Sequence, residues 1–158
     1  MLFKYFTPIL FLFLFTPLFA QKLEPTFKHV SYGAHKDMKL NFWKIDSDKP
    51  TPLLVHIHGG GWLGGKKHET TGPSQLKNGY SYASIDYRLA GTELLPAAVH
   101  DAARAIQFLR TKAKEWNFDP KRIAVTGGSA GAASSMWLAY HDDMADPKSK
   151  DPVLRQSS

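Results

Sequence analysis

The chain has 158 residues, 43% hydrophobic and 22% charged, a balance typical of globular proteins rather than disordered ones. It contains no cysteine, which excludes a disulfide framework, a cysteine-based metal site and a thiol nucleophile. The formal net charge is +6, but basic residues are scattered among acidic ones along the whole chain, so we predict no nucleic-acid partner.

Residues 1–20 have the composition of a secretory signal peptide. Lys4 gives the positive start, Ile9–Phe15 is an uninterrupted apolar run, and Ala20 is a small residue suited to the position before a cleavage site. An uncleaved membrane anchor is the alternative, but the run is well short of the roughly 20 residues that a spanning helix needs. We therefore predict a secreted or periplasmic protein without stable membrane insertion, whose mature chain begins at Gln21.

The first part of the mature chain is predicted to be strands. Thr26–Tyr32 and Met38–Ile45 alternate apolar and polar residues, which predicts a β-hairpin with its turn at residues 35–37. Leu53–His58 is a run of mainly branched apolar residues, typical of a strand buried on both faces. It runs directly into three consecutive glycines at positions 59–61.

The rest of the chain alternates helices and strands. Pro96–Trp116 is the clearest helix, because its apolar residues recur at spacings of three and four. The other predicted elements are a short helix near Ser74–Lys77, a strand at Tyr80–Asp86, a connection closed by Asp119-Pro120, a strand at Arg122–Thr126, and a helix from Ala130 to about His141. This alternation predicts an α/β fold with a mainly parallel sheet.

The stretch that organises the chain is Gly127-Gly128-Ser129-Ala130-Gly131, between a predicted strand and a predicted helix. A serine set between glycines at such a junction fits the nucleophile elbow, a strained turn that presents the serine Oγ above the sheet. The chains beside this turn pass too close for side chains, and Gly127 and Gly131 meet that need. A helix beginning at Ala130 also points backbone N–H groups at an anion beside Ser129. A flexible glycine loop is the alternative.

Three blocks together resemble the α/β-hydrolase superfamily, and within it the hormone-sensitive-lipase-like and bacterial secreted carboxylesterases. The blocks are His58–Trp62 (HGGGW), Asp86–Leu89 (DYRL) and Gly127–Gly131 (GGSAG), each after a predicted strand and in the family's order. The resemblance covers roughly residues 27–158. It implies an α/β-hydrolase fold, with a mainly parallel sheet and helices on both faces.

The resemblance implies that Ser129 is the nucleophile that attacks an ester carbonyl and forms an acyl-enzyme. The backbone N–H groups of Gly60, Gly61 and Ala130 would form the oxyanion hole, which stabilises the charge that develops on the carbonyl oxygen. This chemistry requires no metal or cofactor. The remaining histidines show no metal-ligand spacing, and we interpret Asp142 and Asp143 beside His141 as a solvated helix end.

Other residues of these blocks are interpreted as structural. We expect His58 to fix the glycine loop rather than to act as a base. We expect Asp86 and Arg88 to form a structural pair that holds the loop near the oxyanion hole, and a catalytic ion pair is the alternative. Asp101, on the long helix, is expected to be structural. Trp62 is expected to pack beneath the pocket, and lining the pocket is the alternative.

A serine hydrolase also needs a base and an acid that orients the base, and in α/β-hydrolases both follow the serine. The single histidine after Ser129 is His141, on the same predicted helix and about 18 Å away at 1.5 Å per residue. The chain is also shorter than the roughly 200–250 residues of many single α/β domains. We therefore expect residues 21–158 to be the N-terminal portion of one catalytic domain, truncated before its triad Asp and His and inactive alone.

The sequence thus predicts an exported serine carboxylesterase acting on small-molecule or polysaccharide-linked esters. Export and the resemblance suggest acetyl or aromatic-acyl esters of extracellular polysaccharides. The alternative is a non-catalytic binding protein, or a remnant, on a hydrolase scaffold. The oligomeric state is not predicted.

Overall fold

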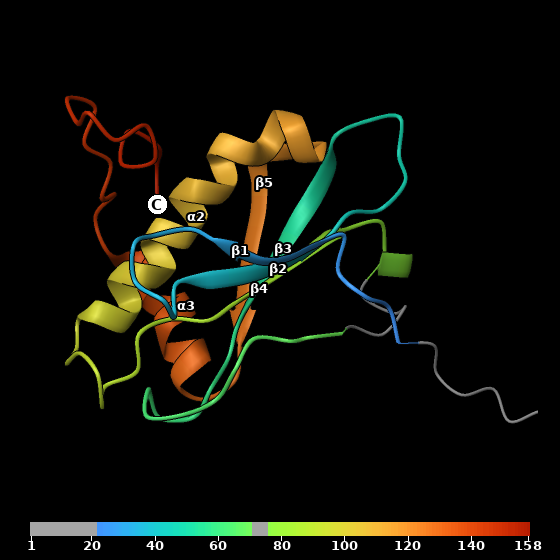
Figure 1. The fold of residues 1–158 in the computed structure, drawn as a ribbon. Helices are drawn as coiled ribbons and strands as arrows, with labels where there is room; N and C mark the ends of the chain where they lie inside the picture. The colour runs from blue at the N-terminus through green and yellow to red at the C-terminus, as the bar shows by residue number, and fades with distance from the viewer. Residues whose placement is uncertain (1–21, 71–75) are drawn as a thin grey trace, which may run out of the picture.

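The computed structural model describes residues 22–70 and 76–158. The signal peptide predicted for residues 1–20 lies outside this part of the chain. The described residues form one twisted sheet with two long helices packed against it (Figure 1). The strands are β1 Phe27–Ser31, β2 Lys39–Trp43, β3 Thr51–Ile57, β4 Ser81–Ile85 and β5 Phe118–Gly127.

The sheet has the strand order β1-β2-β4-β3-β5. Strands β1 and β2 form the predicted antiparallel hairpin, and β2 pairs with β4 in the antiparallel sense. Strand β3 lies between β4 and β5 and is parallel to both, as the alternation of helices and strands predicts. The sheet is therefore antiparallel between β1, β2 and β4 and parallel between β4, β3 and β5. Both glycine-rich segments follow strands of the parallel part.

Helix α2 (Ala97–Trp116) confirms the helix predicted for residues 96–116. Its apolar stripe packs on the sheet. The helix ends at Asn117, whose left-handed conformation (φ 58°, ψ 48°) is one that asparagine tolerates. Between the stripe and the sheet lies a cluster of buried hydrophobic residues. Its most buried members are Leu40, Phe42, Leu53, Val55, Ile57, Ala83, Ile85, Ala102, Ala105, Leu109 and Phe118.

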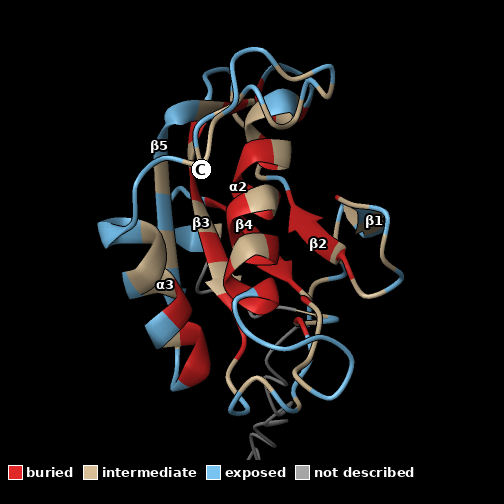
Figure 2. Cartoon of the chain, turned by 90° about the vertical axis from the view of Figure 1, so that its left-hand side faces the viewer, coloured by how far each residue is buried: buried red, intermediate tan, exposed pale blue. Residues whose placement is uncertain are grey.

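Helix α3 (Ala130–Tyr140) lies beside α2 on the same face of the sheet. Figure 2 shows α2 as a buried column over β3 and β4, whereas much of α3 and β5 is exposed. The rings of His100 in α2 and Trp137 in α3 meet with their centroids 5.7 Å apart. Of the short helix expected near residues 74–77, residues 74–75 lie outside the described residues and residues 76–77 are helical. Helices on both faces remain a prediction. Neither α2 nor α3 is long and apolar enough to cross a membrane.

Strand β5 confirms the strand predicted at residues 122–126 and also begins earlier, at Phe118. Phe118 pairs with Thr51, but the next aligned pair is Ile123 with Leu53, so the register shifts between them. Asp119-Pro120 therefore lies in an irregular part of the strand and not in a connection before it. The Asp119 carboxylate holds this part by accepting the backbone N–H of Lys121. At its other end β5 runs directly into the elbow.

The opposite face of the sheet carries a row of polar side chains. The register aligns Asn41 of β2 with Ser84 of β4, Ser84 with His56 of β3, and His56 with Thr126 of β5. His68 covers part of this row: its backbone N–H donates to Ser84 Oγ at 2.9 Å and its ring stacks on His56, with centroids 4.2 Å apart. The segment after the glycine loop is thereby fixed to the sheet.

Candidate active site

Ser129 lies on the sharp turn between β5 and α3. Its backbone angles are φ 54° and ψ −123°, a positive φ that is uncommon for a non-glycine residue and marks local strain. Ser129 is exposed, and the next residue, Ala130, begins α3. The structure thus gives this serine the strained strand-to-helix turn expected of a nucleophile elbow.

Two glycines make the elbow possible, as the sequence predicts. A β-carbon on Gly131 would collide with the carbonyl oxygen of Ile57 and lie 2.9 Å from that of His58. One on Gly127 would collide with the same Ile57 oxygen and lie 2.7 Å from the carbonyl carbon of Gly131. At Gly128, by contrast, nothing lies within 4 Å of such an atom. The need for glycine is therefore specific to positions 127 and 131.

The glycine loop, residues 58–67, follows β3 and touches the elbow. A β-carbon on Gly59 would lie 2.6 Å from the Gly128 carbonyl oxygen and 3.4 Å from Ser129 Cβ. Gly60 and Gly61 have φ values of 107° and 62°, which favour glycine. The carbonyl of Gly60 accepts the N–H groups of Leu63 and Gly64, closing a tight turn. In Figure 1 this loop and the β5–α3 turn lie at the same end of the sheet.

The base of the glycine loop is closed by one carboxylate, that of Asp86 at the end of β4. Asp86 Oδ1 accepts the backbone N–H of Lys67 at 2.6 Å and lies 3.8 Å from His58 Nε2. Asp86 Oδ2 lies 3.1 Å from Lys67 Nζ. Because His58 and Lys67 are the two ends of the loop, this single side chain holds both ends together.

Lys67 is buried, with 5% of its side chain exposed, and it also binds Glu69 at 2.8 Å. Burial alone would lower the pKa of Lys67, but the hydrogen bonds to Glu69 and Asp86 outweigh it and raise the pKa. The ammonium group therefore stays charged inside the loop. Glu69, which is half exposed, has its pKa lowered chiefly by the hydrogen bond from Lys67.

His58 has the structural role expected from the sequence. Its Nδ1 lies 2.8 Å from the Gly59 carbonyl oxygen, and its ring stacks on Tyr87 with centroids 4.2 Å apart. The Tyr87 hydroxyl donates to the His58 carbonyl at 2.8 Å. Burial, and then the charge of Asp86, raise the pKa of Tyr87 to about 12, so the hydroxyl keeps its proton as a donor.

The expected pairing of Asp86 with Arg88 is wrong. Asp86 binds Lys67, whereas Arg88 binds Asp101 of α2 through Nη2 at 2.7 Å and through Nε at 2.9 Å. The Arg88 backbone N–H also donates to Asp101, whose side chain is 1% exposed. The reason is that the chain leaves the sheet after β4, so residues two apart turn towards different elements. The structural role expected of Asp101 is confirmed.

The tip of the glycine loop is held by Trp62. Its indole Nε1–H donates to Ser134 Oγ of α3 at 3.1 Å, and its carbonyl accepts the N–H of Ala90 at 2.7 Å. The ring packs against the core, as expected. It also lines a groove of about 300 Å³. The other lining residues are Leu95, Pro96, Val99, Ala133 and Trp137.

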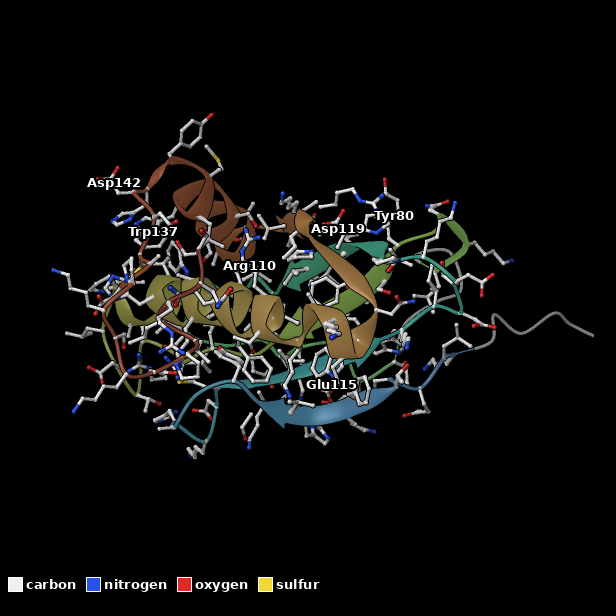
Figure 3. All side chains as sticks on the ribbon, turned by 90° about the horizontal axis from the view of Figure 1, so that it is seen from above. Tyr80, Arg110, Glu115, Asp119, Trp137 and Asp142 are labelled. Carbon is white, nitrogen blue, oxygen red and sulfur yellow. The ribbon has the colours of Figure 1, made fainter. Side chains whose placement is uncertain are left out.

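Within the described residues 22–70 and 76–158, no histidine or carboxylate makes a hydrogen bond to Ser129 Oγ. Ser129 precedes α3 and His141 follows it, so the two lie at opposite ends of this helix. The His141 ring stacks on Trp137, and Figure 3 shows Trp137 and Asp142 together at this end of α3. Asp142 and Asp143 are exposed, as predicted for a solvated helix end, and Asp143 accepts the backbone N–H groups of Ala145 and Ser158. Among the described residues, no group of three or more His, Asp or Glu is placed to hold a metal ion.

Sequence reasoning missed Lys67 and Ser134. Both lie in stretches without a motif of their own, the polar segment after the glycines and the body of α3. One signal was available for Lys67. It follows a glycine-rich turn, and such a turn brings the residues before and after it close together. Ser134 shows no comparable signal, because its partner Trp62 is 72 positions away in the sequence.

Comparisons with known proteins agree with this geometry. The sequence profile of the family described as BD-FAE matches residues 42–156. The carboxylesterase NlhH of Mycobacterium tuberculosis is 38% identical over 114 residues, covering 70% of this chain and 36% of the relative. A probable carboxylic ester hydrolase of the same bacterium, LipM, is 33% identical over 117 residues, with 70% and 27% covered.

Solved structures give the same result. An acetyl ester-xyloside bifunctional hydrolase from Caldicellulosiruptor lactoaceticus aligns with a TM-score of 0.67 at 36% identity, covering 75% of this chain and 44% of that one. A bacterial heroin esterase aligns with a TM-score of 0.56 at 33% identity, covering 66% and 35%. The chain spans about a third of the length of the curated relatives it matches.

Proposed function

Because the chain belongs to the BD-FAE family of α/β-hydrolases, whose relatives include carboxylesterases, we propose that it carries the nucleophile half of a serine carboxylesterase. The observation that carries the proposal is Ser129 on its strained turn (φ 54°, ψ −123°), with the glycine loop against it. A serine held this way presents its hydroxyl and surrounds it with backbone donors.

The proposed reaction is acyl transfer in two steps. Ser129 Oγ attacks the ester carbonyl carbon as a base removes its proton, and the carbonyl oxygen becomes an oxyanion. The tetrahedral intermediate collapses, the alcohol leaves with the proton, and an acyl-enzyme remains on Ser129. Water then attacks the same carbonyl carbon and releases the acid, which restores the serine hydroxyl.

The oxyanion would be stabilised from two sides. As the first residue of α3, Ala130 has no carbonyl one turn earlier in the helix to accept its N–H, and the helix dipole adds positive character there. Gly60 and Gly61 would supply N–H groups from the loop beside the elbow. Their positive φ values of 107° and 62° support this assignment, because glycine adopts them without strain.

We propose that the complete enzyme is longer than residues 1–158 and supplies the base and its acidic partner from elsewhere. It would be exported, with Gln21 as the mature N-terminus, and would act on small-molecule or polysaccharide-linked esters, acetyl or aromatic-acyl groups among them. Export is tested by mass spectrometry of the N-terminus of the secreted protein.

The decisive experiment replaces Ser129 by Ala in the complete enzyme. Hydrolysis of short p-nitrophenyl esters should fall by at least about 10⁴-fold, since the nucleophile is lost. A matched variant, Ser135→Ala in the same helix, should keep wild-type activity. Covalent labelling by a fluorophosphonate should require Ser129 in the complete enzyme, and the 158-residue chain alone should not label.

Two outcomes would overturn the proposal. Wild-type protein without esterase activity or labelling would favour a non-catalytic binding protein on a hydrolase scaffold. Activity that survives Ser129→Ala would place the nucleophile elsewhere.

A further inference from the structure

The proposed oxyanion hole is built from two separate segments, and something must set the distance between them. Gly60 and Gly61 belong to the glycine loop, whereas Ala130 belongs to α3. An oxyanion donor is useful only within about 2.7–3.1 Å of the oxygen, so a small shift of one segment removes part of the effect.

One side chain joins the two segments directly. Ser134, 1% exposed, donates its hydroxyl hydrogen to the Ala130 carbonyl at 2.9 Å. The same oxygen accepts the Trp62 Nε1–H at 3.1 Å. A hydroxyl has one donor and two acceptor positions, so both bonds form at once. Ser134 therefore links the residue after the nucleophile to the residue after Gly61.

Trp62, on the loop side of this link, is held rigidly, so its position can determine that of the neighbouring glycines. Trp62 has a φ of 59°, in the left-handed region, and its carbonyl is held by the Ala90 N–H at 2.7 Å. Its ring packs against the core. With backbone and indole both fixed, Trp62 anchors Gly61 from its C-terminal side. The Gly61 N–H belongs to the preceding peptide, whose Gly60 carbonyl accepts the N–H groups of Leu63 and Gly64. The position of this short turn then follows from where Ser134 holds the indole.

Ser135 provides a natural comparison within the same helix. Its hydroxyl donates to the Gly131 carbonyl at 2.9 Å, the same local bond that Ser134 makes one residue earlier. Ser135 has no hydrogen bond to the glycine loop within the described residues. The local helical bond and the link to the loop can therefore be separated by mutation.

We propose that Ser134 is a positioning residue, which sets the distance between the two halves of the oxyanion hole through the Trp62 indole. The inference rests on the proposed esterase function. It predicts that breaking the link weakens stabilisation of the transition state and leaves binding of the ground-state ester nearly unchanged.

The test measures kcat and KM for p-nitrophenyl acetate in the complete enzyme, with the variants Ser134→Ala, Trp62→Phe, their double mutant and Ser135→Ala. Each of the first two removes one partner of the link, so kcat should fall about 10-fold with KM within about twofold. This is smaller than the roughly 10²–10³-fold loss for removing an oxyanion donor outright. The double mutant should be no worse than either single one, because both break the same contact.

A further readout separates positioning from general destabilisation. Affinity for a boronic acid transition-state analogue should fall in proportion to kcat in Ser134→Ala and remain unchanged in Ser135→Ala. If Ser134→Ala does not fold, Trp62→Phe, which mainly removes the indole donor, decides the question by the same measurements.

The inference is overturned if the loss appears in KM alone, if Ser135→Ala loses as much kcat, or if the two losses multiply in the double mutant. It is also overturned if Ser134→Ala and Trp62→Phe both keep wild-type kcat while Ser129→Ala is inactive. That last result would leave the esterase function standing. Activity that survives Ser129→Ala would instead sink the function itself.

Discussion

The two segments of the candidate site are held in different ways. The elbow, residues 127–131, depends on backbone packing, since Gly127 and Gly131 lie against the Ile57 carbonyl with no room for a β-carbon. The glycine loop, residues 58–67, depends on side chains that reach it from other elements. Those side chains are Asp86, Tyr87 and Ser134, with Lys67 inside the loop.

This difference determines how each segment should fail. Where backbone packs against backbone there is no free space, so a single added methyl group must displace the strand or the helix. A set of polar contacts can lose one member and keep the rest, and its strength depends on charge and pH. The elbow should therefore respond to mutation in an all-or-none way and the loop in a graded way.

The largest expected effect tests the elbow. Gly131→Ala places a β-carbon against the carbonyl oxygens of Ile57 and His58, and we expect it to cost about 3 kcal/mol of folding free energy or to prevent folding. This sign is opposite to that of an ordinary Gly→Ala change inside a helix, which stabilises by about 1 kcal/mol. Urea unfolding of the complete enzyme measures it.

The matched control is Gly128→Ala, in the same turn but with nothing within 4 Å of the added atom. It should leave the free energy of unfolding within about 0.5 kcal/mol of wild type. Equal stability of the two variants would show that backbone contact does not hold the elbow.

An intermediate effect is expected at the base of the glycine loop. Asp86→Asn removes the carboxylate that faces the buried Lys67 ammonium at 3.1 Å. Among the described residues, the half-exposed Glu69 is then the charged partner that remains. We expect a loss of about 2 kcal/mol, below the 3–5 kcal/mol for breaking a fully buried pair, because one partner remains. Thermal or urea unfolding measures the loss.

Glu69→Gln is the control, because it removes the other acidic partner of the same lysine. Glu69 has 47% of its side chain exposed against 21% for Asp86, so the loss should stay below about 1 kcal/mol. If the two variants lose equal stability, Asp86 is not the residue that closes the loop.

The same contrast explains what the sequence could predict. The elbow is five consecutive residues, and its glycine requirement follows from the turn itself, so Ser129, Gly127 and Gly131 were predicted with the right surroundings. The strands and helices followed from apolar periodicity. The supports of the loop join residues far apart in sequence, such as Trp62 and Ser134, and no local spacing encodes such pairs. Hence the sequence predicts that Asp86 pairs with Arg88, its neighbour two residues on, whereas the structure pairs it with Lys67.

The smallest expected effect is the pH dependence of stability that comes from His68, in the segment after the glycine loop, and from His56 beneath it. Burial, followed by the charges of His68 and His58, lowers the pKa of His56 to about 4, and burial also lowers the pKa of His68. The two rings stack at 4.2 Å, His56 Nδ1 lies 3.4 Å from Ser84 Oγ, and His68 Nδ1 lies 2.7 Å from the Tyr82 hydroxyl. Protonating either ring would place a charge in this stack.

The sign follows from proton binding. In the unfolded chain a histidine titrates near 6.5, so between about pH 6.5 and pH 4 the unfolded state binds more protons than the folded state. The free energy of unfolding therefore falls as pH falls through this window. Above the window, the full stability that the neutral histidines contribute is present. Since His56 is partly exposed to solvent, we expect its share to be about 1–2 kcal/mol, less than the full shift implies. The free energy of unfolding, measured with urea, should fall between pH 7.5 and pH 4.5 in both proteins, and the fall should be about 1–2 kcal/mol larger in wild type than in His56→Phe. This variant keeps a ring in the stack without the titrating nitrogen. Equal losses in the two proteins would mean that the stack does not couple the segment after the glycine loop to pH.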